Sequence, residues 1–515
     1  MIEARLLTNA RTSVLAFWIG AAAVTAGVLL HVPMFIKSSD MNYMMADMAM
    51  DSGMVLGMGL IVAGTLLAGY GLLPVGCSGS DIGSRPKALH AVEALDGRLT
   101  RAHWWLMATI ALALVIDTMK PASLGFVVPG MLKEYGLSRP HVAVLPFFAL
   151  MGTTVGSLLW GLLADIFGRR AAILLAAIMF IGTSICGAMP SFAWNIFMCF
   201  MMGMSAGGML PIAFTLLTET VPARHRGALL VLVGGIGQLG GYVVSSACAA
   251  WLEPHFGWRI MWFLGLPTGV LLVLLNRFIP ESPGFLMAHG REAEAGRVLA
   301  DFGADLARVP PREAATSALK PLLGLLPVSF SLNLAAVAWG LVNFGLILWL
   351  PTDLRARGYT VQGSDTLLAL SALTALPTAA FTAWLYSFWS AKGTVILLFT
   401  MIALALVGLG ASDRVAPLLG ESPMPLLVLL IVGANGVIAA LLPYSAESYP
   451  MQFRGRGTGF VAGSSKLGGM AAQIVSMLQT IPALGSATLV LALPVVFAAA
   501  LIGLFAVDTR GRHHL

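Results

Sequence analysis

The sequence predicts an all-α membrane protein with fourteen transmembrane helices: two related halves preceded by two further N-terminal helices. Three observations support this fold class, namely the composition, the number of long apolar segments and a stretch that occurs twice. The chain has 515 residues, of which 58% are hydrophobic and only 10% are charged, whereas soluble proteins are roughly 25% charged. The net charge of +6 is therefore read as loop charge of a membrane protein, and no nucleic-acid partner is expected.

A helix needs about 20 mainly apolar residues to cross a bilayer. Fourteen segments meet this requirement and alternate with short polar loops. They lie near 12–31, 53–74, 103–131, 141–164, 170–188, 193–218, 228–252, 258–279, 323–351, 365–389, 393–411, 424–446, 457–481 and 484–507.

The distribution of basic residues predicts the orientation. With both termini in the cytoplasm, 21 Lys and Arg residues fall in or beside cytoplasmic loops and seven fall on the outer side. Cytoplasmic loops of membrane proteins carry such an excess. We therefore expect a multi-pass protein of the cell (inner or plasma) membrane with N- and C-termini cytoplasmic.

The repeated stretch covers 219–241 and 447–469. It matches without a gap at nine of 23 positions, including Glu219 with Glu447, Arg226 with Arg454 and the closing Leu-Gly-Gly. Such internal similarity indicates two related halves, and in a membrane protein it points to a transporter whose site lies where the halves meet.

The chain then divides into four parts. We expect two extra helices with a Met-rich outer loop and a cytoplasmic linker over 1–101, and a six-helix half over 102–279. A cytoplasmic linker over 280–322 and a second six-helix half over 323–515 complete the chain.

Several loop motifs are similar to those of the major facilitator superfamily. Gly161-Leu-Leu-Ala-Asp165-Ile-Phe-Gly168-Arg169-Arg170 resembles the signature between its second and third core helices, and Gly257-Trp258-Arg259 is also typical. Pro280-Glu281-Ser282-Pro283 resembles the metabolite:proton symporter and sugar-porter-like branch. The resemblance implies a 6+6 helix bundle with pseudo-twofold symmetry that works by alternating access.

The resemblance also implies a gate. The family's cytoplasmic cluster closes that side of the transporter in one state and releases it in the other. The residues expected in this role are Gly161, Asp165, Gly168, Arg169, Arg170, Glu219, Arg226, Glu447 and Arg454.

Three charged residues lie well inside apolar spans: Asp117, Lys120 and Lys466. Each costs about 2.5–3.5 kcal/mol at a helix centre on insertion scales, and such residues usually mark a transport pathway. Asp117 and Lys120 share a helix face and could simply neutralise one another. Lys466 has no acidic neighbour within one turn and occupies the repeat position of Gln238. It could instead be a lysine that extends to the membrane surface without contacting substrate.

The charge of these residues predicts the substrate. If all three face one cavity, their sum is +1, and a small organic anion would balance it. We expect Lys120, Lys466, Gln238 and Asn343 to bind substrate and Asp117 to couple transport to protons. The Asn343-Phe-Gly-Leu-Ile-Leu-Trp349 stretch resembles the organic-acid symporters more than the sugar porters.

Methionines give an alternative. Eight lie between Met34 and Met58, with Met50, Met54 and Met58 spaced as a helical stripe. Thioethers select soft cations such as Cu(I), so a copper importer using these three residues is the rival interpretation. Flexible apolar packing explains the same stripe.

We conclude that the sequence predicts a secondary active transporter, not an enzyme, that takes up a small organic anion together with protons. An exporter of a metabolite or drug, and a receptor without flux, remain alternatives. No cofactor is expected, and the protein is expected to be a monomer in the lipid bilayer.

Overall fold

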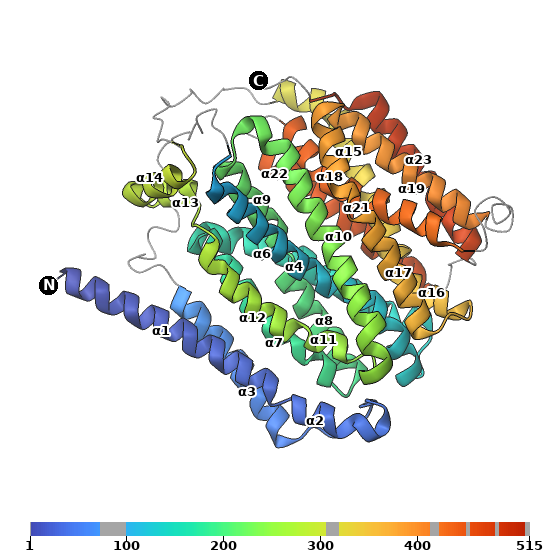
Figure 1. The fold of residues 1–515 in the computed structure, drawn as a ribbon, viewed down its shortest axis with the longest axis horizontal. Coiled ribbons are helices and arrows are strands. Elements are labelled where there is room, and N and C mark those ends of the chain that lie inside the picture. The colour runs from blue at the N-terminus through green and yellow to red at the C-terminus, as the bar shows by residue number, and fades with distance from the viewer. Residues whose placement is uncertain are drawn as a thin grey trace. The chain divides into compact units, whose positions relative to one another are not determined.

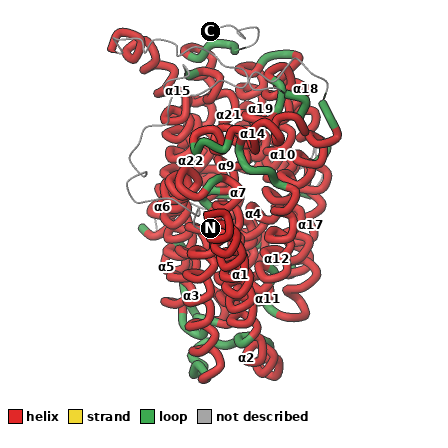
Figure 2. Tube along the Cα trace, turned by 90° about the vertical axis from the view of Figure 1, so that its left-hand side faces the viewer, coloured by secondary structure: helices red, strands yellow, loops and turns green. Residues whose placement is uncertain are grey.

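The computed structural model describes residues 2–72, 99–304, 319–411, 422–449, 454–478 and 484–509. Within these ranges every regular element is helical and no strand occurs (Figure 2). Parts of both predicted linkers, over 73–98 and 305–318, lie outside the described residues, so the linker predictions there stay predictions.

Two long helices precede the rest of the chain, α1 (Ile2–Leu29) and α3 (Ser52–Leu72), with the short α2 (Val32–Lys37) between them. They run side by side in Figure 1. Glycines allow this approach: a Cβ on Gly20 would lie 2.5 Å from the backbone oxygen of Gly64, and one on Gly27 would lie 2.6 Å from that of Gly57. Small residues at such spacing are the usual means of close helix packing in lipid.

The first half consists of helices that carry its six predicted spans. Several spans are broken into two shorter helices, as where α8 gives way to α9 at Gly207 and Gly208. Its helices are α4 (Arg101–Glu134), α5 (Arg139–Val142), α6 (Val144–Phe167), α7 (Arg169–Gly182), α8 (Phe192–Ala206), α9 (Met209–Thr220), α10 (Ala223–Phe256), α11 (Ile260–Phe263) and α12 (Gly265–Leu275). The helices α13 (Pro283–Ala288) and α14 (Glu292–Asp301) follow it.

The second half also carries six predicted spans. Its helices are α15 (Leu319–Gly345), α16 (Leu350–Ala356), α17 (Val361–Ala375), α18 (Thr378–Phe388), α19 (Ala391–Gly410), α21 (Met424–Ser448), α22 (Arg454–Met477) and α23 (Leu484–Phe505). Its breaks are distributed differently from those of the first half: its first two spans are interrupted, whereas its fourth and sixth are the single helices α21 and α23. Short 3-10 turns lie at Ser38–Met41, Thr183–Ala188, Asn276–Phe278 and Ile347–Trp349.

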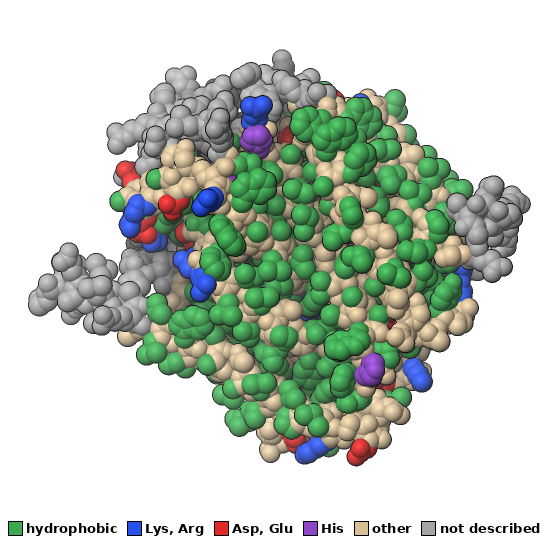
Figure 3. Space-filling view, in the orientation of Figure 1, with side chains coloured by type: hydrophobic (Ala, Val, Ile, Leu, Met, Phe, Trp, Pro, Cys, Tyr) green, Lys and Arg blue, Asp and Glu red, His purple; other side chains and the backbone are tan. Residues whose placement is uncertain are grey.

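Thirteen helical segments of the described chain are long and apolar enough to cross a membrane. They coincide with thirteen of the fourteen predicted spans. The remaining one falls on α22, which is a helix of 24 residues but does not reach the required hydropathy. Glycines, serines and Lys466 fill its middle. The face drawn in Figure 3 is mainly hydrophobic with few charged side chains, as expected for a protein in lipid.

The chain forms two compact units that combine segments distant in sequence. One comprises Met1–Ile116, Gly152–Arg224 and Arg259–Glu313, and the other comprises Asp117–Met151, His225–Trp258 and Ala314–Leu515. The second unit therefore holds α10 and most of α4 together with the helices of the second half. It contains Asp117, Lys466 and their neighbours, so their contacts lie within one unit.

Candidate functional site

The centre of α4 carries a polar group on an otherwise apolar helix. Asp117 lies midway along the 34 residues of α4, and Pro121 follows four residues later. A proline inside a helix cannot donate to the carbonyl four residues before it. Pro121 thus leaves the backbone carbonyl of Asp117 without its helical partner, which adds a hydrogen-bond acceptor beside the carboxylate.

Lys466 reaches this group from the middle of α22. Its ammonium interacts electrostatically with the Asp117 carboxylate. Lys466 has no acidic neighbour within one turn of its own helix, and Asp117 on α4 is the acidic group that interacts with it. Both side chains are only partly buried, so the pair retains access to a ligand.

Two aromatic rings flank the Lys466 ammonium. Nζ lies 5.2 Å from the ring centroid of Phe344 and 6.0 Å from that of Trp339, both on α15. An ammonium within about 6 Å of an aromatic face gains roughly 0.5–2 kcal/mol. Trp339 is held in place because its indole N–H donates to the backbone oxygen of Ala434 at 2.6 Å. The site therefore combines a cation with a rigid aromatic wall.

The remaining predicted binding residues surround the same region of the unit. Thr118, next to Asp117, donates its hydroxyl hydrogen to the side-chain oxygen of Gln238 at 2.9 Å. Asn343, next to Phe344, is half-buried, and its amide has no hydrogen-bond partner among the described residues. Lys120 is 1% exposed, so its ammonium is shielded from solvent in this conformation.

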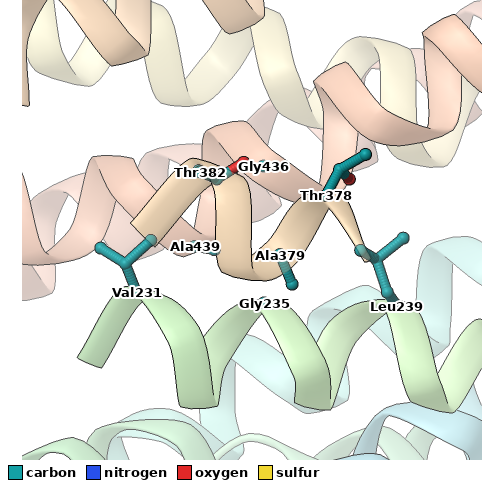
Figure 4. A pocket seen from close by; sticks show the side chains of 8 residues that line it. All are labelled: Val231, Gly235, Leu239, Thr378, Ala379, Thr382, Gly436 and Ala439. Carbon is teal, nitrogen blue, oxygen red and sulfur yellow. The ribbon is translucent and has the colours of Figure 1, made fainter. Parts of the chain in front are cut away.

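A narrow pocket lies close to Gln238 but does not match an anion. It separates α10 from α18 and α21, and Figure 4 shows that small or apolar side chains form its walls. Its lining residues are Val231, Gly235, Leu239, Thr378, Ala379, Thr382, Gly436 and Ala439. A Cβ on Gly235 would lie 3.1 Å from Ala379 Cβ. We interpret this pocket as a close helix contact.

The predicted gate motif of the first half is built around the start of α7. Gly168 has φ +97° and precedes that helix, a conformation that glycine adopts readily. Arg169 pairs with Asp165 at 3.3 Å, and its backbone N–H donates to Glu281 at 2.7 Å. Arg170 is exposed, and its N–H donates to the same carboxylate at 3.4 Å.

Glu281 also belongs to this cluster, although no gating role was expected for it from the sequence. Its carboxylate accepts from the first N–H groups of α7, where the helix dipole favours negative charge. Burial raises the pKa of Glu281, and the backbone N–H donors of Ser282, Arg169 and Arg170 oppose that rise. The sequence feature that could have pointed to Glu281 is the Pro280-Glu281-Ser282-Pro283 motif, which contains it.

The other predicted gate residues have varied surroundings. Glu219 accepts from the Ser282 hydroxyl and from the N–H of Gly284 at 3.1 Å, so its partners belong to the start of α13. Glu447 accepts from the Thr509 hydroxyl at 2.6 Å. Arg226 is half-buried on α10, and Gly161 is exposed on α6 with open space beside it.

Arg454 begins α22, and its side chain lies outside the described residues. The expected gating roles of Arg454 and the other gate residues therefore stay predictions.

A second charged cluster was missed by the sequence analysis. Arg355 on α16 donates to both oxygens of Glu253, at 2.9 and 3.0 Å, and to Asp365 at 2.9 Å. Beside it, Arg139 donates to Asp353 at 2.7 Å. Arg139 and Arg355 are two of the seven basic residues expected on the outer side. Their acidic partners are distant in the sequence, so the sequence alone could not identify these ion pairs.

The methionine stripe has a packing explanation. Met54 is fully buried in a cluster with Phe17, Met34 and Ile178, and Met58 packs against that cluster. Met50 is 36% exposed. In the described residues no group of three His, Cys, Asp or Glu side chains is arranged to hold a metal ion.

Comparison with known proteins identifies the class of transporter. The profile of the Major Facilitator Superfamily matches residues 110–473, so the chain belongs to this superfamily. It is a membrane transporter and not an enzyme.

Relatives with known names cover most of this chain. It is 28% identical over 387 residues to the niacin transporter NiaP of Acinetobacter baylyi, covering 72% of this chain and 86% of that one. It is 26% identical over 391 residues to the 4-hydroxybenzoate transporter PcaK of the same organism, covering 72% and 84%. It is 28% identical over 407 residues to a gallate transporter of Pseudomonas putida, covering 74% and 86%.

Solved structures confirm the fold. The xylose transporter XylE from E. coli, in a partially occluded inward-open conformation, matches with a TM-score of 0.64 at 17% identity. The match covers 79% of this chain and 98% of XylE. At this identity the likeness shows the superfamily fold alone.

Proposed function

We propose that the protein takes up small aromatic carboxylates together with protons. The observation that carries this proposal is the Lys466 ammonium, which lies over the rings of Phe344 and Trp339 and interacts electrostatically with the Asp117 carboxylate. An ammonium attracts a carboxylate, and flanking rings favour an aromatic one by stacking. The named relatives transport niacin, 4-hydroxybenzoate and gallate, which are aromatic acids.

The coupling follows from charge balance. In the absence of substrate, Asp117 and Lys466 neutralise each other. A bound monoanion would compete with Asp117 for the ammonium and leave one negative charge too many. A buried uncompensated charge costs several kcal/mol, so a proton on Asp117 restores neutrality. Substrate and proton would therefore bind together and cross together.

The other polar residues orient the substrate in this proposal. Asn343 offers an amide with free hydrogen-bonding capacity beside Phe344, and Gln238 is oriented by Thr118. A hydroxyl or ring nitrogen on the substrate suits such partners. Lys120, buried in this conformation, would contact substrate only if the halves rearrange during alternating access.

We also propose that α22 crosses the membrane despite its low hydropathy. A transmembrane helix that lines a polar cavity can have polar residues on the face towards that cavity. With α1 and α3 as two further spans, this gives fourteen spans and cytoplasmic termini, in agreement with the excess of basic residues in the predicted cytoplasmic loops. The Asp165–Arg169 cluster would then belong to the cytoplasmic gate, and the protein would act as a monomer.

The test uses purified full-length protein in liposomes. Radiolabelled 4-hydroxybenzoate, nicotinate and an aliphatic acid of similar size are offered with an inward proton gradient and without one. The proposal expects gradient-driven accumulation of the aromatic acids, which Lys466→Gln abolishes. Equal accumulation without the gradient, or an unaffected Lys466→Gln variant, would contradict it.

A further inference from the structure

The cluster around Arg355 contains more negative than positive charge. One guanidinium holds two carboxylates: Glu253 from α10 in the first half and Asp365 from α17 in the second. Glu253 is 7% exposed and Asp365 is fully buried. The neighbouring pair of Arg139 with Asp353 is balanced one to one. Only the Arg355 cluster would therefore bury a net charge of −1 if both carboxyl groups were ionised.

Burial and proximity make that ionised state costly. The carboxyl groups of Glu253 and Asp365 lie within hydrogen-bonding reach of each other. Two carboxylates at such a distance in a buried site cannot both keep their charge easily, and sharing one proton is the common solution. A shared proton also turns the repulsive contact into a hydrogen bond and brings the cluster to neutrality.

We propose that Glu253 and Asp365 share one proton and form a second proton-binding site, distinct from Asp117. Around the pair, α16 supplies Arg355, α17 supplies the Ser364 hydroxyl, which donates to Asp365 at 2.9 Å, and α10 supplies Tyr242. These are the charged and titratable groups that the described structure places against the two carboxyls.

Tyr242 is a further polar group that interacts with Asp365. Its side chain is 9% exposed, its hydroxyl has no hydrogen-bond partner among the described residues, and it interacts electrostatically with Asp365. A buried hydroxyl without a partner costs free energy. The Tyr242 hydroxyl is therefore a group of the same unit whose energy depends on the charge of Asp365.

The position of the site links the proton to conformation, and this step rests on the proposed alternating-access function. Glu253 belongs to the first half, whereas Arg355 and Asp365 belong to the second. Separation of the halves at this end would leave Arg355 and Asp365 as a balanced pair and would let Glu253 ionise in water. Closure then takes up a proton, so acid shifts the equilibrium towards the closed end by up to about tenfold per pH unit.

The experiment detects the proton directly and needs no substrate. Infrared difference spectra of the purified full chain in lipid nanodiscs are recorded while the pH is raised, with the protonated carboxyl band as readout. Glu253→Gln and Asp365→Asn each leave Arg355 with one carboxylate, so both variants should fold, which size-exclusion profiles check. Asp353→Asn is the matched control from the balanced pair, and Asp117→Asn separates this site from the central one.

The proposal expects a band for one protonated carboxyl near neutral pH that both Glu253→Gln and Asp365→Asn remove and both controls retain. A band that persists in either of the two variants would overturn it, and so would a band lost in Asp117→Asn. Replacing Na⁺ by choline should leave the band unchanged, and a change would assign the site to a metal cation instead. Failure of aromatic-acid uptake would refute the proposed function without altering this result.

Discussion

The helices α10 and α22 carry the two copies of the repeated stretch, and at one of the positions that differ α10 has a neutral residue and α22 a basic one. Both end the repeat with Leu-Gly-Gly, and both use these glycines to approach another helix closely. A Cβ on Gly241 would lie 2.6 Å from Thr118 Cβ, and one on Gly468 would lie 2.2 Å from the backbone oxygen of Val337. Just before this motif, α10 has Gln238 and α22 has Lys466.

The difference between Gln238 and Lys466 changes the kind of contact that each helix makes with α4. Gln238 and Lys466 interact with consecutive residues of α4, Thr118 and Asp117. The first contact is a neutral hydrogen bond and the second is an interaction of opposite charges. The shared Leu-Gly-Gly therefore supports close helix packing, whereas Lys466 adds a positive charge that interacts with Asp117.

The most severe way to break this asymmetry is Lys466→Gln, which makes α22 equal to α10 at this position. It leaves Asp117 without the nearby cation, and an uncompensated charge at the centre of a membrane helix costs about 2.5–3.5 kcal/mol. We expect uptake of 4-hydroxybenzoate to fall by about 100-fold or more. Initial rates in liposomes measure the effect, and the reconstituted amount serves as control. Uptake within twofold of the unaltered protein would show that the asymmetry has no role.

The sequence alone could single out Lys466 as a candidate site residue, because a lysine inside an apolar span can be recognised without a structure. The repeat, the helix positions and the superfamily loop motifs were equally local signals. The interaction between Lys466 and Asp117 could not be predicted in this way. The two residues lie about 350 positions apart, and only tertiary packing brings them together. The same holds for Glu253, Arg355 and Asp365, which look like ordinary residues at span ends.

Asp117→Asn tests the other member of the pair. Asparagine resembles the protonated carboxyl, so Lys466 stays free to bind the anion while proton coupling is lost. We expect accumulation driven by a pH gradient to fall by at least about tenfold, with exchange of labelled for unlabelled substrate retained. Parallel assays of net uptake and exchange distinguish these. Equal loss of both activities would mean that Asp117 is needed for binding and not for coupling.

The shared glycines should affect stability in both copies. Gly468→Ala places a methyl group against the backbone of α15, and overpacking costs about 1–3 kcal/mol. Gly241→Ala should cost a similar amount, because it meets Thr118 and the Met119 backbone. Gly463→Ala is the control, since a Cβ there meets nothing within 4 Å. The midpoint of thermal unfolding in detergent should be higher for the control than for the other two variants. Equal midpoints for all three would argue against close packing at the repeat.

Phe344→Leu addresses the aromatic wall, which the α22 copy contacts through Lys466. The loss of stacking between this ring and an aromatic substrate, about 0.5–1.5 kcal/mol, should raise the KM for 4-hydroxybenzoate by about threefold to tenfold. The KM for an aliphatic acid should change less. Uptake rates at a series of concentrations of each substrate give both KM values. An equal rise in the two KM values would show that the Phe344 ring does not select aromatic substrates.

The smallest effect belongs to the neutral copy. Thr118→Val removes the hydrogen bond to Gln238, which is worth about 1 kcal/mol and thus roughly fivefold in affinity. We expect KM to rise by about that factor while the pH dependence of uptake stays unchanged. A loss of pH dependence would show that α10 takes part in proton coupling as α22 does.

Proton uptake on substrate binding tests the central claim most directly. Calorimetry of 4-hydroxybenzoate binding to the purified protein, in buffers that differ in ionisation enthalpy, reports the protons taken up per anion bound. We predict about one proton per anion for the unaltered protein and none for Asp117→Asn. Binding without proton uptake in the unaltered protein, or unchanged uptake in Asp117→Asn, would contradict the exchange of Asp117 for a substrate carboxylate at Lys466.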